Sequence, residues 1–312
     1  MHQNNAFNMG KVQLARIAVS AMLLPVLTCF RAVAQEVGQY GFLEIPVSAR
    51  ASALGGCALS VVEPETSLID QNPGLICSEM SGQCSLSYIN YVAGINLGYA
   101  SYAGRFLSEG AWACSARYVD YGKFDGYDPD GNSTGKFTAK DIVIGGSVGY
   151  PLTNRWNIGG TLRAIYSHYD IYSAFAIGVD VGVNWYDEAS GSSFSAVVTN
   201  LGGQLKSLDD HYQHLPTQAA VGYSKEVEHL PVCVSLSAVR LFDWGTSFAK
   251  HLVVGAEWII TDRLYFAAGY NFSHFSAGGG FRYRDWLFQF SYARYNSLDG
   301  SLGIGISYSL QH

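Results

Sequence analysis

Two pairs of polar residues have the spacing of known catalytic motifs. Ser247 and Lys250 form an S-x-x-K sequence, as in penicillin-binding proteins, but the S-D-N and K-T-G motifs that accompany it there are absent. Ser167 and His168 could supply a nucleophile and its base, but neighbouring residues of a strand point to opposite faces and cannot pair. The sequence therefore predicts no catalytic residue, and we expect that the chain is not an enzyme.

An acidic stretch has the residue types that bind a divalent cation. Its oxygen-bearing side chains are Asp125, Asp128, Asp130 and Asn132. An EF-hand loop needs Gly at its sixth position and Glu at its twelfth, and a loop that starts at Asp128 has Ser133 and Ala139 there. We therefore expect a solvated loop without a metal, and no motif indicates a cofactor.

The amino-acid composition of the chain indicates which kind of secondary structure positions these residues. Charged residues make up 14 % of the 312-residue chain, against about 25 % in ordinary soluble domains. This shortage of charge indicates that much of the surface avoids water. No apolar run after residue 34, however, approaches the ~20 residues of a membrane helix. Alternating strands explain both observations, because only one face of each strand is apolar.

Strand-length stretches with this alternation follow one another from residue 84 to the end of the chain. An even number of antiparallel strands suits a barrel that its first and last strands close. We therefore predict an all-β fold, a transmembrane antiparallel β-barrel of about 14 strands, rather than a soluble β-sandwich. The predicted strands are 84–92, 94–105, 109–121, 140–150, 155–167, 174–187, 192–201, 216–227, 232–243, 250–261, 264–272, 278–284, 286–296 and 300–310.

The two faces of each predicted strand differ in character. In 174–187, Ile177 and Val179 lie on an apolar face that suits lipid, and Asp180 lies on a face of small and polar residues that suits a barrel lumen. Polar lumen-facing side chains are predicted at Asp141, Arg163, Asp180, Asn184, Glu257 and Gln289. They could line a polar path or hydrogen-bond to a segment inside the barrel, and we favour the second role.

The first 34 residues have the features of a cleavable secretory signal. Lys11 and Arg16 precede a mostly apolar stretch, and small residues at positions 32 and 34 predict cleavage after Ala34. Cleavage leaves 16 basic and 25 acidic residues, a formal net charge of −9, which argues against a nucleic-acid partner. The five cysteines that remain are an odd number, so a disulfide framework is not expected, although Cys77 and Cys84 could bridge.

Residues 35–83 do not alternate and are rich in small residues and turn residues. We predict that they form a plug inside the barrel of residues 84–312, a periplasmic tail being the alternative. The residues that mark this segment are Arg50, Gly55, Gly56, Asn72, Pro73 and Gly74.

Two connections between predicted strands are long and polar, residues 122–139 and 202–215. Outer-membrane barrels place their long loops outside the cell. We therefore predict that these loops are extracellular and bind a partner. The candidate partner-binding residues are Asp125, Tyr127, Asp128, Asp130, Asp209, Asp210 and His211.

Several short motifs carry a resemblance to a known group of proteins. They are FLEIP at 42–46, SAR at 48–50, ALGG at 53–56, QNPG at 71–74, LSYINY at 86–91, GYASY at 98–102 and YGKFD at 121–125. The chain resembles the PorQ/PorV group of outer-membrane components of the type IX secretion system, most densely between residues 40 and 150. The Asn-Pro step is shared with the wider FadL-like barrels, where Ala often stands in place of Gly74.

This resemblance implies a role that alternation alone does not reveal. A PorQ-like barrel, embedded in outer-membrane lipid, would anchor a surface-exposed PorZ-like subunit in the attachment complex for secreted cargo. The sortase-like PorU and its partner PorV would lie beside it. The alternative is a FadL-like conduit for hydrophobic small molecules, for which the glycines at 145–146 and 278–280 could mark a break in the barrel wall.

Overall fold

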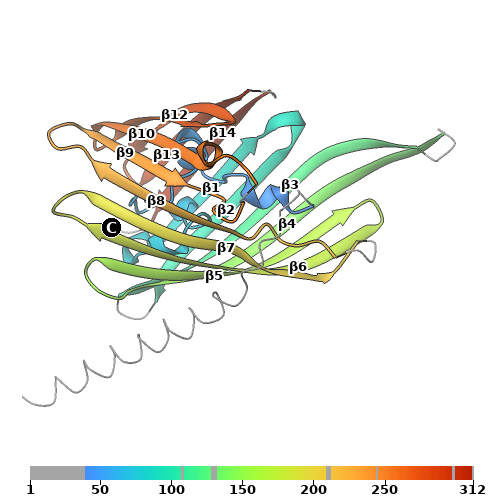
Figure 1. Ribbon diagram of the computed structural model, residues 1–312, viewed down its shortest axis with the longest axis horizontal. Coiled ribbons are helices and arrows are strands. Elements are labelled where there is room, and N and C mark those ends of the chain that lie inside the picture. Colours follow the sequence, from blue (N-terminus) through green and yellow to red (C-terminus); the bar gives the residue numbers. More distant parts are fainter. Residues whose placement is uncertain are drawn as a thin grey trace, which may run out of the picture.

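The computed structural model describes residues 39–106, 109–127, 132–208, 212–243, 245–296 and 299–310. The chain forms a closed barrel in which consecutive strands are antiparallel neighbours and the last strand pairs with the first (Figure 1). The strands are β1 (Gln83–Asn90), β2 (Asn96–Phe106), β3 (Gly110–Tyr127), β4 (Ser133–Pro151), β5 (Trp156–Tyr169), β6 (Tyr172–Asp187), β7 (Ser192–Lys206), β8 (Gln218–Glu226), β9 (Val232–Ala238), β10 (Leu252–Thr261), β11 (Leu264–Asn271), β12 (His274–Tyr283), β13 (Trp286–Tyr295) and β14 (Gly300–Ser309). The predicted fold, a closed antiparallel barrel of 14 strands, is confirmed.

Alternation explains why these stretches form a barrel wall. In β13, Phe288 and Phe290 are exposed on the outer face, whereas Gln289 and Ser291 between them are buried inside. In β6, Val179 is exposed and Asp180 is fully buried. Such a wall presents apolar side chains outward, the reverse of a soluble barrel. Within the described residues, no helix has the length and apolar character needed to cross a membrane.

Residues 122–139 were predicted to be a loop, and this is wrong. β3 and β4 continue as paired strands to Tyr127 and from Ser133, so they form a hairpin that extends past the neighbouring strands (Figure 1). The exposed Phe124 stacks on Phe137 across this hairpin, with ring centroids 5.4 Å apart. Asp125 lies on β3, 3.7 Å from Lys136.

The predicted loop at 202–215 is also shorter than expected. β7 continues to Lys206, and a single β-bridge joins Gly203 to His214. β9 ends at Ala238 rather than at 243, because the chain turns at Arg240 with a φ of 54°. Five predicted partner-binding residues lie outside the described residues, namely Asp128, Asp130, Asp209, Asp210 and His211.

The glycine-rich stretches do not break the wall. β12 pairs continuously with β11 and β13 through Gly278, Gly279 and Gly280, and β4 pairs continuously through Gly145 and Gly146. An added Cβ at Gly278 would lie 2.7 Å from the Cβ of Ala53, so this glycine allows close packing of an inner segment.

An irregularity of the wall lies instead between β6 and β7. The pairing register shifts between Val179 and Val181, opposite a bulge in which Asn200 has a φ of 57°. Asp180, which lies within the shift, accepts a hydrogen bond of 2.7 Å from the backbone N–H of Asn200. A side chain thus replaces the missing backbone pairing, and the wall stays joined here.

Residues 39–82, here called the N-terminal segment, lie inside the ring of strands (blue in Figure 1). The segment contains short helices, η1 (Gly41–Glu44), α2 (Ala49–Ala53), η2 (Thr66–Leu68), η3 (Pro73–Leu75) and η4 (Ser78–Met80). Further 3-10 turns, η5 (Val92–Gly94) and η6 (Phe248–His251), lie between strands. Ser48 caps α2 by accepting the N–H of Ala51 at 3.4 Å. Residues 1–38, with the predicted signal, lie outside the described part.

Apolar side chains of the N-terminal segment pack against the inner faces of the strands. Tyr40, Phe42 and Val47 form one cluster with Leu97 of β2 and Val119 of β3. A second cluster joins α2 to β11 and β13, and a third joins η4 to β2 and β3. The interior is therefore a packed core in these regions. The five cysteines of the described residues are free thiols, so Cys77 and Cys84 are not bridged.

Candidate functional site

The Asn72-Pro73-Gly74 motif forms a tight turn against the barrel wall. The side chain of Asn72 accepts the N–H of Gly74 at 2.8 Å and donates to the carbonyl of Leu59 at 2.9 Å. An added Cβ at Gly159 of β5 would lie 2.0 Å from the carbonyl oxygen of Pro73. The motif therefore brings the backbone of the N-terminal segment against the backbone of β5.

Gly55 and Gly56 form a second close contact with the wall. Their φ angles, 86° and 91°, are ones that L side chains rarely adopt. Asn271 of β11 donates to the carbonyl of Gly55 at 2.7 Å, and the hydroxyl of Ser276 of β12 accepts the N–H of Gly55 at 2.9 Å. A Cβ at Gly269 would lie 2.1 Å from the backbone nitrogen of Gly55.

A charge-balanced cluster joins the N-terminal segment to β3, β5 and β6. It consists of Asp70, Arg117, Arg163 and Asp180, and is here called the Asp70 cluster. Arg163 donates to Asp70 at 2.8 Å and to Asp180 at 2.5 Å, and Arg117 binds the second oxygen of Asp70. Arg117 also donates to the carbonyl of Phe42 at 2.9 Å. Two cations thus face two anions in a buried site.

The electrostatics of Asp70 follow from these partners. Burial alone would raise the pKa of the Asp70 carboxyl, but the Arg117 and Arg163 guanidiniums outweigh it and hold the pKa below its ordinary value. Asp70 is therefore an anion at neutral pH and fixes both arginines.

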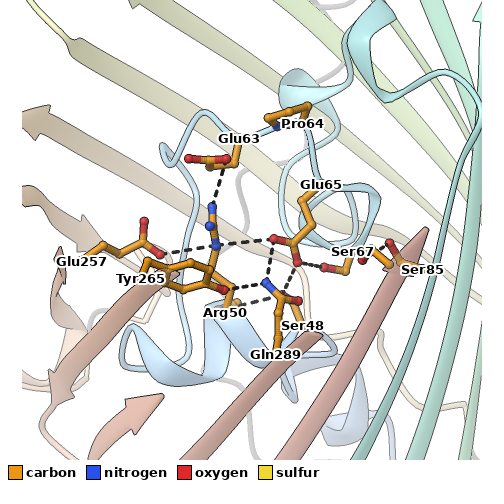
Figure 2. Close-up of polar contacts among 12 residues, drawn as sticks. Ser48, Arg50, Glu63, Pro64, Glu65, Ser67, Ser85, Glu257, Tyr265 and Gln289 are labelled. Carbon is orange, nitrogen blue, oxygen red and sulfur yellow. Dashed lines mark hydrogen bonds and ion pairs between the residues drawn. The ribbon is translucent and has the colours of Figure 1, made fainter. Parts of the chain in front are cut away.

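A second cluster, around Arg50 of α2, is not charge-balanced. It consists of Arg50, Glu63, Glu65 and Glu257 of β10, and is here called the Arg50 cluster (Figure 2). The guanidinium nitrogens lie 3.5 Å from Glu63 and 3.4 Å from both Glu65 and Glu257. The guanidinium also lies over the Tyr265 ring, 4.2 Å from its centroid. One cation here faces three carboxyl groups.

The carboxyl groups of the Arg50 cluster differ in their surroundings. Glu65 accepts hydrogen bonds from Ser48 at 3.3 Å, from Gln289 at 3.0 Å and from Ser67. Burial works to lower the pKa of Arg50, but Glu257, Tyr265, Glu63 and Glu65 raise it well above its ordinary value, so the guanidinium stays charged.

A chain of hydroxyl groups connects the N-terminal segment to the strands where the barrel closes. Thr66 shares a hydrogen bond of 2.7 Å with Ser85 of β1, which shares another of 2.7 Å with Ser307 of β14. Ser101 of β2 donates to Thr66 at 3.0 Å. The first and last strands are thus linked through buried side chains as well as through their backbones.

The six side chains predicted to face the lumen are all buried. Arg163, Glu257 and Gln289 contact the N-terminal segment directly, and Asp180 contacts it through Arg163. Asp141 and Asn184 instead bond to side chains of neighbouring strands, tyrosine hydroxyls for Asp141 and serine hydroxyls for Asn184.

Asp70, Glu65 and Arg117 were missed as site residues. Asp70 and Glu65 lie in a segment without periodicity, so no pattern in the sequence indicates their orientation. Arg117 did carry a signal, because it shares a face of small residues with Ala113 and Ser115 in β3.

A cavity of about 360 Å³ lies between the N-terminal segment and the end of the barrel where β9 ends and β10 begins. Leu43, Val197 and Val253 give it apolar walls, and Arg240 and His251 are among its polar lining residues. An ion pair of 2.5 Å between Arg240 and Glu44 lies beside it. The lining also includes Gly56, Asp70 and Arg163. Among the described residues, no group of His, Cys, Asp or Glu side chains is placed to hold a metal.

Comparison with known proteins shows the fold but not a family. No protein-family model matches the chain, and no curated protein matches its sequence significantly. Among solved structures, the CymD monoaromatic hydrocarbon channel is similar with a TM-score of 0.60 and 11 % identity over 86 % of this chain and 99 % of that one. The toluene transporter TodX of Pseudomonas putida has a TM-score of 0.58 and 11 % identity over 84 % and 97 %, and a FadL homologue of Pseudomonas aeruginosa has 0.55 and 10 % over 85 % and 98 %.

At these identities the likeness concerns architecture. The chain has the fold of a FadL-like outer-membrane β-barrel. The finer resemblance to type IX secretion components finds no support in these comparisons.

Proposed function

We propose that this protein is an outer-membrane conduit that takes up small hydrophobic molecules. The observation that carries the proposal is the cavity between the N-terminal segment and the end of the barrel. Its volume of about 360 Å³ falls in the range of small-molecule sites, ~300–1,000 Å³, and its apolar walls with a few polar groups are typical of them. The fold it shares with a monoaromatic hydrocarbon channel and a toluene transporter supports the same class of ligand.

Passage through such a conduit would require movement of the N-terminal segment. Gly55, Gly56 and Asp70 of this segment line the cavity, and the apolar clusters of α2 and η4 pack the segment against the wall. A molecule in the cavity therefore reaches the segment before it reaches the far end of the barrel. The segment would act as the plug that opens.

Val253 and Val254 offer a matched test, because they are neighbours on opposite faces of β10. Val253 lines the cavity and Val254 is exposed on the outer face. We expect the Val253→Phe variant to take up less radiolabelled toluene, because its ring fills the cavity, and the Val254→Phe variant to match the wild type. Uptake is measured in Gram-negative cells that lack other FadL-like barrels, with equal amounts of folded protein.

Two results would contradict the conduit. Wild-type cells could take up toluene no faster than cells without the protein. Alternatively, both variants could behave like the wild type, which would show that the cavity is not on the route.

A second candidate function is the anchor role implied by the resemblance to PorQ. The observation that favours it is the β3–β4 hairpin, which extends past the barrel (Figure 1). Phe124 of this hairpin is exposed. In this role the barrel would sit in outer-membrane lipid and hold a PorZ-like subunit, beside PorU and PorV.

Affinity purification of the tagged protein should then recover such a subunit, and the Phe124→Asp variant should lose it while toluene uptake is unchanged. Recovery of the barrel alone from membranes that retain the complex would exclude the anchor.

A further inference from the structure

The two ionic clusters that hold the N-terminal segment differ in charge balance. The Asp70 cluster pairs two arginines with two aspartates. The Arg50 cluster sets one arginine against three glutamates (Figure 2). If all three glutamates were ionised, this cluster would carry two uncompensated negative charges.

The groups around Glu257 supply no second cation among the described residues. Arg50 contacts it from α2, and Glu63 and Glu65 contact the same guanidinium from other parts of the N-terminal segment. Cys233 of β9 is its cross-strand neighbour, and the ring of Tyr265 of β11 lies against Arg50. Arg50, Glu65 and Glu257 are each at least nine-tenths buried. Carboxyl groups that share such a site cannot all ionise, because their repulsion and their lost hydration disfavour the charged form.

The surroundings of the three carboxyl groups indicate which one remains neutral. Glu65 accepts three side-chain hydrogen bonds, and Glu63 keeps 30 % of its side chain exposed to solvent. Glu257 is 3 % exposed, and its Oε1 atom receives no hydrogen bond, with the Arg50 Nε atom 3.4 Å away. A neutral carboxyl tolerates such a site much better than a carboxylate does.

We propose that the Arg50 cluster binds one proton on Glu257 at neutral pH, and that loss of this proton at higher pH loosens the N-terminal segment from β10. The carboxylate left on the wall would repel Glu63 and Glu65 of the segment, with one guanidinium between them. Loss of the proton adds a negative charge to a buried cluster that has one cation, so the attachment of the segment to β10 is strongest at lower pH and weakens as the pH rises.

Infrared spectroscopy of the full chain in detergent micelles tests where the proton lies. The wild-type minus Glu257→Gln difference spectrum at pH 7 should contain the carbonyl band of a protonated carboxylic acid, and this band should shift in D₂O. The matched wild-type minus Glu63→Gln spectrum should contain carboxylate bands instead. Carboxylate bands in the Glu257 spectrum would overturn the proposal.

A second measurement keeps the test decisive if Glu257→Gln does not fold. In an Asp141→Asn background, which removes another buried carboxyl group, the neutral minus alkaline difference spectrum should still contain the protonated band, and its absence would overturn the proposal.

Hydrogen exchange then measures how firmly the N-terminal segment is held. Protection of residues 48–65 should fall on raising the pH in the wild type, after correction for intrinsic rates, and an unchanged protection would refute the loosening.

Discussion

Asp70 connects the N-terminal segment to two strands at once, through Arg117 and Arg163. Removal of one member of a buried ionic network leaves the other charges without compensation and typically costs about 3–5 kcal/mol. We expect the Asp70→Asn variant to lose this much free energy of unfolding. Urea titrations of the folded barrel in lipid, followed by tryptophan fluorescence, measure it.

The control for this variant is an ion pair at the surface. Arg155 and Asp187 lie 3.1 Å apart, and the Arg155 side chain is 60 % exposed. Asp187→Asn should change stability by less than about 1 kcal/mol. Equal losses in the two variants would contradict a special role for Asp70.

The pH dependence of stability gives a second prediction at Asp70. Its pKa in the folded protein is depressed by Arg117 and Arg163, below the ~3.9 of an unfolded aspartate. A depressed pKa means that the stabilisation is present above about pH 4 and disappears as the pH falls through the folded value. The difference in urea midpoint between the wild type and Asp70→Asn should therefore shrink under acid conditions. A difference that is constant down to strongly acid pH would show that the Asp70 charge contributes nothing.

The polar residues of the strands could be predicted from the sequence more easily than the residues of the N-terminal segment that they contact. Arg163 and Glu257 could be predicted because a charge on a face of small residues stands out in an alternating strand. Asp70 and Arg50 lie in a segment whose conformation depends on the barrel around it, so no local pattern predicts their contacts. Only the folded wall brings Asp70 beside Arg117, 47 positions away.

At the scale of elements, alternation decides which face of a strand meets lipid. Val179 lies near the middle of β6 on the outer face, and an arginine there should cost about 2–4 kcal/mol in assembly. Leu205 is exposed near the end of β7, where the same change should cost about 0–1 kcal/mol. We expect Val179→Arg to reduce the heat-modifiable, folded fraction on gels and Leu205→Arg to leave it nearly unchanged. Normal assembly of Val179→Arg would show that this face does not meet lipid.

The β3–β4 hairpin shows the limit of composition as a guide to elements. Residues 122–139 are rich in Gly and Asp, which favours a loop. The strands nevertheless continue, since Phe124 and Phe137 stack across the pair and Asp125 faces Lys136. These contacts join two strands, so the sequence of either strand considered alone does not predict them.

At the scale of the whole molecule, the barrel and its contents can be separated by deletion. Removal of residues 39–82 takes away the apolar clusters and the Asp70 and Arg50 anchors together. Migration of the remaining barrel as a folded protein on gels is the control. We expect this barrel to conduct ions across planar bilayers much better than the full chain does, because its lumen is lined by polar side chains. Equal conductance of the two proteins would show that the N-terminal segment does not close the lumen.

The hydroxyl chain from Thr66 through Ser85 to Ser307 has a consequence for the alignment of the two strands that close the barrel. β14 follows the other strands of the barrel in the sequence, and its pairing with β1 closes the barrel. A slip of one residue in that pairing would turn Ser307 to the outer face and leave the Ser85 hydroxyl without it. Thr66 of the N-terminal segment therefore holds a hydroxyl group of β1 that pairs with Ser307 only when β14 is correctly aligned. Ser85, which Thr66 holds in place, thus favours the correct alignment of a strand that lies 222 positions later in the sequence.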